Sequence, residues 1–215
     1  MVHNLSLNNS IINQFVAEVR DVSIQGDRMR FRRNLERIGE IFAYEISKTL
    51  TFEMKEVTTP LGVANVPVLK DQPIIGTILR AGLPLHNGLL NYFDQADNAF
   101  ISAYRKHHKD GTFDIKLEYV GSPSIVNREL ILCDPMLATG SSMVMTYKAL
   151  VEKGMPKHTH IVCALASLQG IEYVKSNMPE NVTIWAAAID EELTAQAYIV
   201  PGLGDAGDLA FGSKL

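Results

Sequence analysis

The stretch ILCDPMLATGSSM, residues 131–143, contains the change of pattern that decides the fold. It begins as an apolar run that stops at Asp134, as a buried strand does when it reaches the edge of a sheet. Small and hydroxylated residues follow, and Met143 to Leu150 then have a helical pattern. We therefore expect a turn that leads from the end of a buried strand into the start of a helix.

The same alternation continues on both sides of this turn, from Pro73 onwards. The expected strands are Ile74–Leu79, Ala99–Tyr104, Leu130–Cys133, His160–Ala166 and Val182–Ala187, and the expected helices are Leu83–Phe93, Met143–Lys153 and Leu168–Asn177. These strands are almost continuously apolar, as is typical when helices cover both faces of a parallel sheet. The pattern predicts an α/β fold with a central parallel sheet flanked by helices.

Residues 1–72 are expected to form an arm of helices and a hairpin that belongs to the same domain as the core at 73–215. A short helix is expected within the first 20 residues, because one helical face carries Ile11, Ile12, Phe15, Val16 and Val19. A longer helix is expected from about Asp27, a plausible cap, to Thr49. β-Branched residues on both sides of Pro60-Leu61-Gly62 then predict an irregular hairpin or two edge strands.

Two further segments depart from the strand–helix rhythm. Residues 112–120 alternate between apolar and polar side chains, which predicts a two-stranded flap at about 106–122. The tail, at about 189–215, contains YIVPGLGDAGDLAFGSKL from Tyr198 onwards and is expected to be mostly loop because it is rich in glycine.

The composition excludes several classes of protein. Apolar residues make up 47% of the 215 residues, charged residues 20%, and the formal net charge is -4, so a broad surface for nucleic acid or membrane is not expected. The N-terminus lacks the pattern of a signal peptide, and no apolar run approaches the roughly 18–20 residues that span a bilayer. Cys133 and Cys163 both lie in apolar strands, which favours free thiols in a reducing cytoplasm.

The turn after Asp134 has the chemistry of a phosphate site. A helix N-terminus offers free N–H groups and a partial positive charge, Gly140 allows close approach of the backbone, and hydroxyls are available at Thr139, Ser141 and Ser142. Asp134 suits sugar hydroxyls or a metal-bound water rather than a phosphate. Together they favour a ribose 5-phosphate. The alternative is that the hydroxyls only cap the helix.

Three motifs resemble those of the type I phosphoribosyltransferases, and of the uracil phosphoribosyltransferases in particular. They are DPMLATG at 134–140, ILRAGLP at 78–84 and YIVPGLGDAGD at 198–208. The helical FRRNLERIGEIFAYE, AYR at 103–105 and AAIDE at 187–191 also fit, in the same order along the chain. The resemblance implies the type I phosphoribosyltransferase fold. It also implies conversion of uracil and 5-phosphoribosyl 1-diphosphate (PRPP) to UMP and pyrophosphate in pyrimidine salvage.

The resemblance also implies roles for individual residues. Catalytic roles fall to Arg80, Arg105 and Asp134, with Lys106 assisting. The PRPP site would comprise Arg80, Arg105, Asp134, Pro135, Met136, Leu137, Ala138, Thr139, Gly140, Ser141, Ser142 and Asp205. Uracil would be bound by Ile199, Gly204, Asp205 and Ala206. Mg²⁺ would be held mainly through PRPP, with Asp205 as a possible ligand, and the flap would close over PRPP. The family also implies a homodimer or homotetramer.

Two positions depart from the family pattern. Leu209 stands where an Arg is common, which leaves open a phosphoribosyltransferase for another nucleobase or a non-catalytic nucleotide-binding regulator. Ser141 replaces a glycine, which the loop should tolerate unless that backbone needs a positive φ.

Several other residues invite a chemical interpretation that the sequence does not favour. Cys133 is expected to be a buried small residue rather than a nucleophile. The pairs His107-His108 and His158/His160 are expected to be surface or structural residues rather than metal ligands. Asp190-Glu191-Glu192 is interpreted as a solvated acidic turn, with a hydrogen bond from Asp190 to the tail as the alternative.

Overall fold

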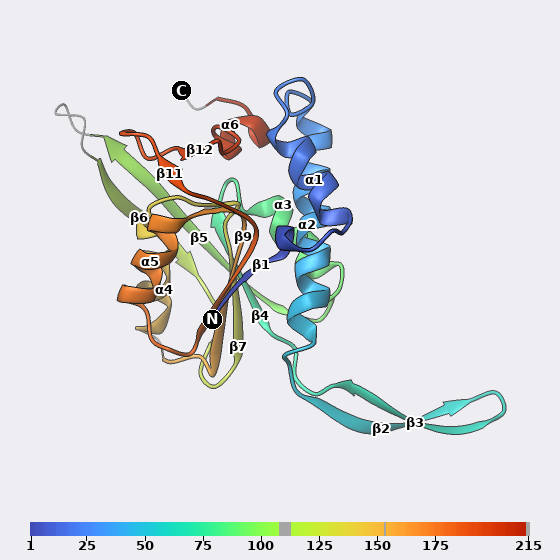
Figure 1. The fold of residues 1–215 in the computed structure, drawn as a ribbon. Coiled ribbons are helices and arrows are strands. Elements are labelled where there is room, and N and C mark those ends of the chain that lie inside the picture. The colour runs from blue at the N-terminus through green and yellow to red at the C-terminus, as the bar shows by residue number, and fades with distance from the viewer. Residues whose placement is uncertain (108–112, 153, 214–215) are drawn as a thin grey trace.

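The computed structural model describes residues 1–107, 113–152 and 154–213, without the side chains of 103–116. Within this part of the chain the centre is an eight-stranded sheet in the order β1-β10-β9-β7-β4-β5-β6, with β8 paired to β9 (Figure 1). The strands are β1 (Val2–Asn4), β4 (Ile74–Leu79), β5 (Asp97–His107), β6 (Phe113–Gly121), β7 (Glu129–Cys133), β8 (Met136–Leu137), β9 (His158–Ser167) and β10 (Val182–Asp190). The pair β5–β6 is antiparallel and the other neighbours are parallel. The predicted fold class is confirmed.

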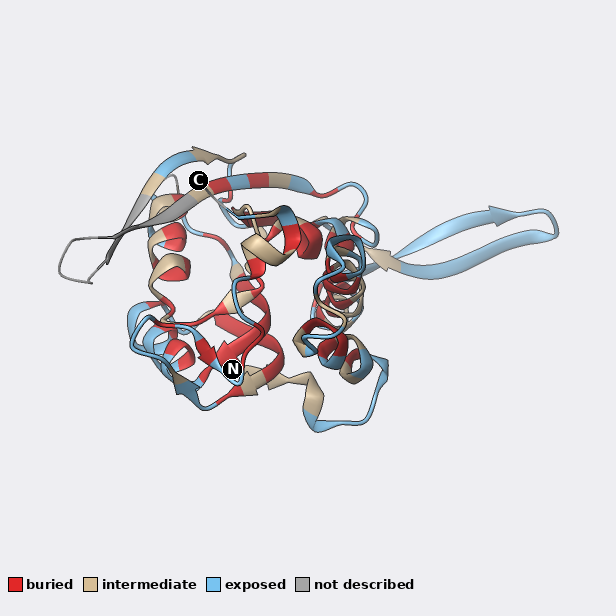
Figure 2. Ribbon diagram, turned by 90° about the horizontal axis from the view of Figure 1, so that it is seen from above, coloured by how far each residue is buried: buried red, intermediate tan, exposed pale blue. Residues whose placement is uncertain are grey.

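Helices cover both faces of this sheet. One face carries α1 (Ile11–Arg20), α2 (Arg28–Ser47) and α3 (Leu83–Leu90), and the other carries α4 (Ser141–Val151) and α5 (Leu168–Asn177). Successive side chains of β7 alternate between the two layers: Ile131 and Cys133 pack with α1–α3, whereas Leu130 and Leu132 pack with α4 and α5. The sheet thus separates two apolar cores, which appear as the red ribbon segments of Figure 2.

Helix α2 shows how local sequence sets an element. The carboxylate of Asp27 accepts a hydrogen bond from the backbone N–H of Arg30 at 3.1 Å, so Asp27 is the N-cap that the sequence predicts. The apolar stripe of this helix, from Phe31 through Ile38 to Ile46, is 0–1% exposed and forms much of the first core. The helix at residues 11–20 packs against the same core as strands β4, β7 and β10. Of its expected apolar face, Ile11 is the exception, because its side chain is 62% exposed.

The predicted hairpin is also confirmed. Strands β2 (Phe52–Thr59) and β3 (Gly62–Leu69) pair antiparallel over their whole length, from Phe52↔Leu69 to Thr59↔Gly62. Every residue of β2 is exposed, and the hairpin projects from the body of the molecule (Figures 1 and 2).

The tail is more ordered than its glycine content predicts. It contains β11 (Glu192–Leu193), β12 (Ile199–Val200) and helix α6 (Ala206–Phe211), so the expectation of a loop is wrong at 206–211. Asp205 caps α6, because its carboxylate accepts a hydrogen bond from the N–H of Asp208 at 2.9 Å. This local cap and the packing of Ala206 and Ala210 outweigh the flexibility of the glycines.

Other differences from the expected elements lie at the ends. Strand β1 was not expected; it adds to the sheet edge through Val2↔Ile184 and Asn4↔Ala186, and the 3₁₀ turn η1 (Leu5–Leu7) follows it. Helix α4 starts two residues earlier than expected and α3 ends earlier, at Leu90. Among the helices that the structure describes, none has the length and apolar character that crossing a membrane requires.

Candidate active site

The site lies where the connections of the sheet change direction. Strands β4 and β7 are parallel neighbours, paired through Gly76↔Leu132 and Thr77↔Cys133. The chain leaves β4 into α3 on one face and leaves β7 into α4 on the other face. Ligands of open α/β sheets bind in the crevice that such a divergence opens at the carboxyl ends of the strands. Arg80 and Asp134 are the residues that follow these two strands.

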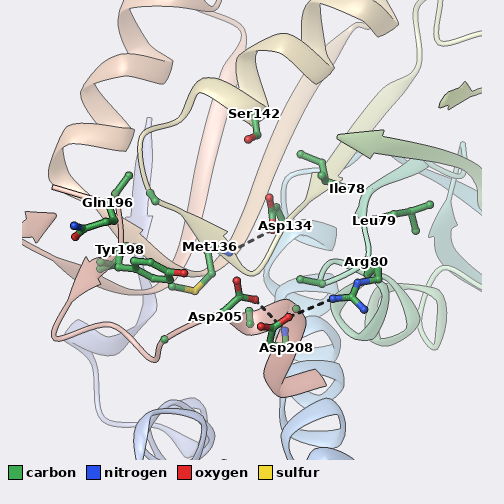
Figure 3. Close-up of a pocket in the computed structure, with 17 residues that line it drawn as sticks. Ile78, Leu79, Arg80, Asp134, Met136, Ser142, Gln196, Tyr198, Asp205 and Asp208 are labelled. Carbon is green, nitrogen blue, oxygen red and sulfur yellow. Dashed lines mark hydrogen bonds and ion pairs between the residues drawn. The ribbon is translucent and has the colours of Figure 1, made fainter. Parts of the chain in front are cut away.

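A cavity of about 530 Å³ opens at this point (Figure 3). Nine of the predicted site residues line it: Arg80, Asp134, Met136, Ala138, Ser142, Ile199, Gly204, Asp205 and Ala206. They come from the three sequence motifs at 78–84, 134–140 and 198–208 or, for Ser142, from the residues just after the second one. The fold therefore brings the loop after β4, the loop after β7 and the tail to one cavity.

The turn after β7 is held tightly by α5. Gly140 is the N-cap of α4 with φ +79°, and a Cβ at this position would lie 2.8 Å from the carbonyl oxygen of Gly170. Ser167 Oγ donates to the carbonyl of Ala138 at 2.6 Å. Positive φ falls on Gly140 and not on Ser141, which lies in the first turn of α4, so the backbone tolerates the serine as predicted.

The remaining residues of the predicted phosphate loop support the cavity without lining it. Pro135, Leu137, Thr139, Gly140 and Ser141 lie in the same turn but are not among the described residues that form the cavity wall. The carbonyl of Pro135 accepts from the N–H of Leu165 at 2.9 Å, and Leu137 is 2% exposed in the second core. The N–H of Ser141 donates to Thr139 Oγ1 at 3.4 Å.

Arg80 is anchored to the tail at the mouth of the cavity. One of its terminal nitrogens, Nη2, lies 3.4 Å from Asp208 Oδ1 and 3.2 Å from the carbonyl oxygen of Gly212 (Figure 3). Its Nε is buried and has no hydrogen-bond partner within the described part of the chain. A guanidinium with an unused buried donor beside a cavity suits a phosphate oxygen, which it can bind through two nitrogens.

Carboxylates come to the cavity from two directions. Asp134 accepts from the N–H of Met136 at 3.5 Å, and Asp205 and Asp208 enter from the start of α6. Asp208 shares the cavity with Arg80, and its side chain is 41% exposed. Such carboxylates suit ribose hydroxyls or a hard cation.

The sequence interpretation of Asp190 as part of a solvated acidic turn is wrong. Asp190 is 7% exposed, and its carboxylate is bound by Arg20 and by the backbone N–H of Gly202 in the tail. The alternative, a hydrogen bond to the tail, is the arrangement that the structure shows. An acidic triplet in sequence does not reveal that a cation 170 residues away reaches one of its members.

Leu209 does not line the main cavity. It belongs to α6, and its side chain is half-buried and packs against the first core. The neighbouring carbonyl, that of Ala210, accepts a hydrogen bond from Arg32 Nη1 at 2.6 Å. The tail is thus fastened to α2 without an arginine at position 209.

Some predicted residues fall outside the description. The backbone of Arg105 lies in β5, paired with Ile115 of β6, but the side chains of Arg105, Lys106 and His107 are outside the described residues. His108 and the centre of the predicted flap, at 108–112, are also outside them. Around it, β6 and the end of β5 pair antiparallel as the edge of the main sheet, and not as a separate two-stranded unit.

The two cysteines and the pair His158/His160 lie outside the cavity, and their surroundings suit structural roles. Burial raises the pKa of the Cys133 thiol to about 12, and both cysteines are free and fully buried, as predicted. His158 Nε2 lies 2.9 Å from Thr183 Oγ1, and His160 Nδ1 accepts a hydrogen bond from Trp185 at 3.1 Å. These histidines stand at the start of β9, at the opposite end of the sheet from the cavity.

Sequence reasoning missed part of the cavity wall. Gln196, Ala197 and Tyr198 line it from the segment before β12, and Asp208 lines it from α6. Ala197 has φ +61°, a backbone conformation that no pattern in the sequence predicts here. Asp208 could have been found, because an Asp at 205 followed by another at 208 is the spacing of a capped helix start.

Comparison with known proteins places this geometry in a family. The family model described as uracil phosphoribosyltransferase matches residues 6–213. A curated uracil phosphoribosyltransferase from Porphyromonas gingivalis is 58% identical, with 100% of this chain and 99% of that protein covered. One from Pyrococcus furiosus is 39% identical over 95% of this chain and 87% of that protein.

A solved structure, that of the AQ2163 protein from Aquifex aeolicus, has the same fold, with a TM-score of 0.86, 28% identity and coverage of 99% of this chain and 98% of that one. Three motifs that are distant in sequence thus meet in one cavity, in a chain that matches its relatives over almost its whole length. The chain belongs to the uracil phosphoribosyltransferase family.

Proposed function

We propose that this protein transfers the 5-phosphoribosyl group of PRPP to uracil and releases pyrophosphate, as a step of pyrimidine salvage. The bond from ribose C1 to the pyrophosphate oxygen breaks, a bond from C1 to uracil N1 forms, and the N1 proton is lost. The observation that carries the proposal is the meeting of Arg80, Asp134 and the tail at one cavity of about 530 Å³. A volume of this size suits a small-molecule site.

The ribose 5-phosphate is assigned to the turn after β7. The first turn of α4 begins at Ser141, and Ser142 lines the cavity, so the N–H groups and hydroxyls of this helix start would bind the phosphate. Asp134 stands between this turn and Arg80, where its carboxylate would accept hydrogen bonds from the ribose hydroxyls (Figure 3). The substrate would then be held at both ends.

The pyrophosphate is assigned to the Arg80 side of the cavity. As the C1–O bond breaks, negative charge grows on the leaving group, and a fixed guanidinium stabilises that charge. Arg80 makes the turn after β4, where Gly82 leaves no room for a side chain because a Cβ there would contact Thr77 Oγ1 and Ile78 O. We assign a second, assisting role to Arg105.

The donor set also fits Mg²⁺. No group of three or more candidate ligands gathers among the residues that the structure describes, so a purely protein-held ion is not what this site suits. Mg²⁺ prefers one or two carboxylates together with phosphate oxygens, and Asp205 lines the cavity as a carboxylate that could serve. When bound, the ion would neutralise charge on the pyrophosphate.

The base is assigned to the tail. Ile199, Gly204 and Ala206 line the cavity and offer backbone carbonyl and N–H groups, which match the acceptor–donor–acceptor edge of uracil. Cytosine would place an amino group against a backbone N–H and leave a buried donor unpaired, which disfavours its binding.

Conversion of radiolabelled uracil to UMP, with PRPP and Mg²⁺, tests this proposal. Cytosine, hypoxanthine and orotate run alongside, because the Leu209 departure bears on base choice. Turnover of uracil alone is the expected result. Turnover of another base in its place would contradict the assignment of the tail, and PRPP binding without turnover of any base would contradict the catalytic proposal.

We also propose a homodimer or homotetramer in the cytoplasm. An isolated two-stranded hairpin is at best marginally stable in water, yet β2–β3 projects with Met54 66%, Leu61 99% and Val63 67% exposed. A second copy of the chain would cover this apolar surface. Light scattering on the protein and on a variant with residues 52–69 replaced by a short linker tests this. The same number of subunits in both would refute the hairpin's role. The two free buried cysteines support the reducing compartment.

A further inference from the structure

We propose that Arg20 and Asp190 are positioning residues for the nucleobase, and that they act by clamping Gly202 of the tail. The inference rests on the proposed function, because it concerns the segment to which uracil is assigned. Neither residue lines the main cavity, so neither touches a substrate there. Their effect would pass through the backbone of one glycine.

The pair makes a closed set of hydrogen bonds. Arg20 Nη1 and Nη2 each donate to a different oxygen of Asp190 at 2.7 Å, which is the bidentate arrangement of guanidinium and carboxylate. Nη1 also donates to the carbonyl oxygen of Gly202 at 3.0 Å. The N–H of Gly202 donates to Asp190 Oδ2 at 3.0 Å. Both backbone polar groups of Gly202 are therefore bound by the same ion pair.

Gly202 is the point at which the tail turns. Its φ is +58°, and a Cβ at this position would contact the carbonyl oxygen and carbon of Ile199. The backbones of Ile199 and Gly202 are thus so close that no side chain fits at position 202. Ile199 precedes it and Gly204 follows it, and both line the cavity. A shift of Gly202 would consequently move the groups on both sides of the base.

The surroundings make this clamp rigid. The side chain of Asp190 is 7% exposed and that of Arg20 is 22% exposed, so water competes little for their hydrogen bonds. Removal of either partner leaves a largely buried charge unpaired, which is the costly way to break such a pair. Arg20 ends α1 and Asp190 ends β10, so two packed elements fix the position of the turn.

The phosphate side of the cavity depends little on this clamp. The turn after β7 is held by α4 and α5, through Leu137 in the second core and the bond from Ser167 to Ala138, and it meets the core of the tail only through Met136 and Ala138. Loss of the clamp should accordingly weaken binding of uracil much more than binding of PRPP. A residue that merely stabilised the fold would not separate the two substrates in this way.

Steady-state kinetics of Arg20→Met and Arg20→Lys test the inference. The Met side chain keeps much of the apolar stem of Arg20 and removes all five donors. We expect its KM for uracil to rise roughly tenfold to a hundredfold, in line with the effect of displacing a binding group by about 1 Å, while its KM for PRPP changes less than about threefold. Lys can keep the charge beside Asp190 but not the planar fork that also reaches Gly202, so an intermediate rise is expected.

Arg30→Met is the matched control. Arg30 also makes a bidentate pair, with Glu18 at 2.9 Å for both nitrogens. This pair joins α2 to α1 and does not touch the tail. This variant should lower the thermal midpoint and leave the ratio of the two KM values unchanged.

The outcomes separate the two proposals. Absence of UMP formation by the unaltered protein overturns the proposed function. If the unaltered protein turns over uracil, the ratio of KM for uracil to KM for PRPP decides the second proposal. An unchanged ratio in both Arg20 variants overturns the clamp, and so does an equal change of the ratio in Arg30→Met. If Arg20→Met does not fold, the ratio measured with Arg20→Lys decides, because Lys keeps the buried charge paired.

Discussion

Three glycine-to-alanine substitutions can separate backbone strain from steric contact in the phosphate turn. Gly140 has φ +79°, and a Cβ there would lie 2.8 Å from Gly170 O and 3.2 Å from Tyr173 Cδ1. Gly204 has φ +93° but nothing within 4 Å of a Cβ, and Gly26 has neither a positive φ nor a neighbour within that distance. The three positions therefore carry both effects, one effect and none.

The expected changes in the free energy of unfolding follow in that order. Gly26→Ala should stabilise by about 0.4–1 kcal/mol, because it restricts only the unfolded chain. Gly204→Ala should destabilise by about 1–2 kcal/mol, the cost of the left-handed conformation for an L-residue. Gly140→Ala adds to this an overpacking cost of about 1–3 kcal/mol, for a total of about 2–5 kcal/mol.

Urea unfolding followed by fluorescence of Trp185, the single tryptophan, measures all three variants. In Gly140→Ala the start of α4 should move away from α5, so the Kd for PRPP should also rise. A Gly140→Ala variant no less stable than Gly204→Ala, with unchanged affinity for PRPP, would refute the close packing of the phosphate turn on α5.

Three other predictions concern the tail, the arm and the core. Leu209→Arg should leave the KM for uracil within about twofold, since Leu209 does not line the cavity, and should destabilise by about 1 kcal/mol through lost apolar burial; kinetics and urea unfolding measure both. Hydrogen bonds from Arg30, Asn34 and Gln14 lower the pKa of Glu18 from 4.5 to about 2, so its stabilisation is complete above pH 4.5 and lost as the pH falls towards 2. The thermal midpoint of Glu18→Gln should thus fall less between pH 5 and 2.5 than that of the unaltered protein, and an equal fall would contradict this. Neither thiol should react with a disulfide reagent at pH 8 until denaturant is added, because both are fully buried; rapid reaction of the native protein would count against the burial.

The sequence predicts those elements whose signals are local. Strand β4 and helix α5 have the predicted bounds. A continuous apolar run indicates a strand that is buried on both faces, and an apolar stripe indicates a helix that is buried on one face. The hairpin follows from its turn residues, and the α2 start from the cap at Asp27. The phosphate turn was found because its glycine, hydroxyls and acid lie within one short segment.

What the sequence does not predict depends on distant partners. Strand β1 is three residues long and gains its identity only by pairing with β10. Asp190 looks solvated until Arg20 reaches it from the other end of the chain. Gln196 and Tyr198 enter the cavity wall because the segment before β12 folds over the sheet, and neither residue belongs to a pattern that indicates contact with a ligand.

The separation of the two apolar cores has an evolutionary consequence. Leu137 of the phosphate turn packs with the start of α4 into the layer built by α4 and α5, and only Met136 and Ala138 of the turn face the other layer. Ile199, Leu203, Ala206 and Ala210 of the tail pack into the layer built by α1–α3. Substitutions can therefore accumulate in one layer with little disturbance of the other, because the sheet stands between them. Homologous enzymes can therefore change their specificity for the nucleobase through substitutions in the arm and the tail. Binding of the sugar phosphate is then largely retained.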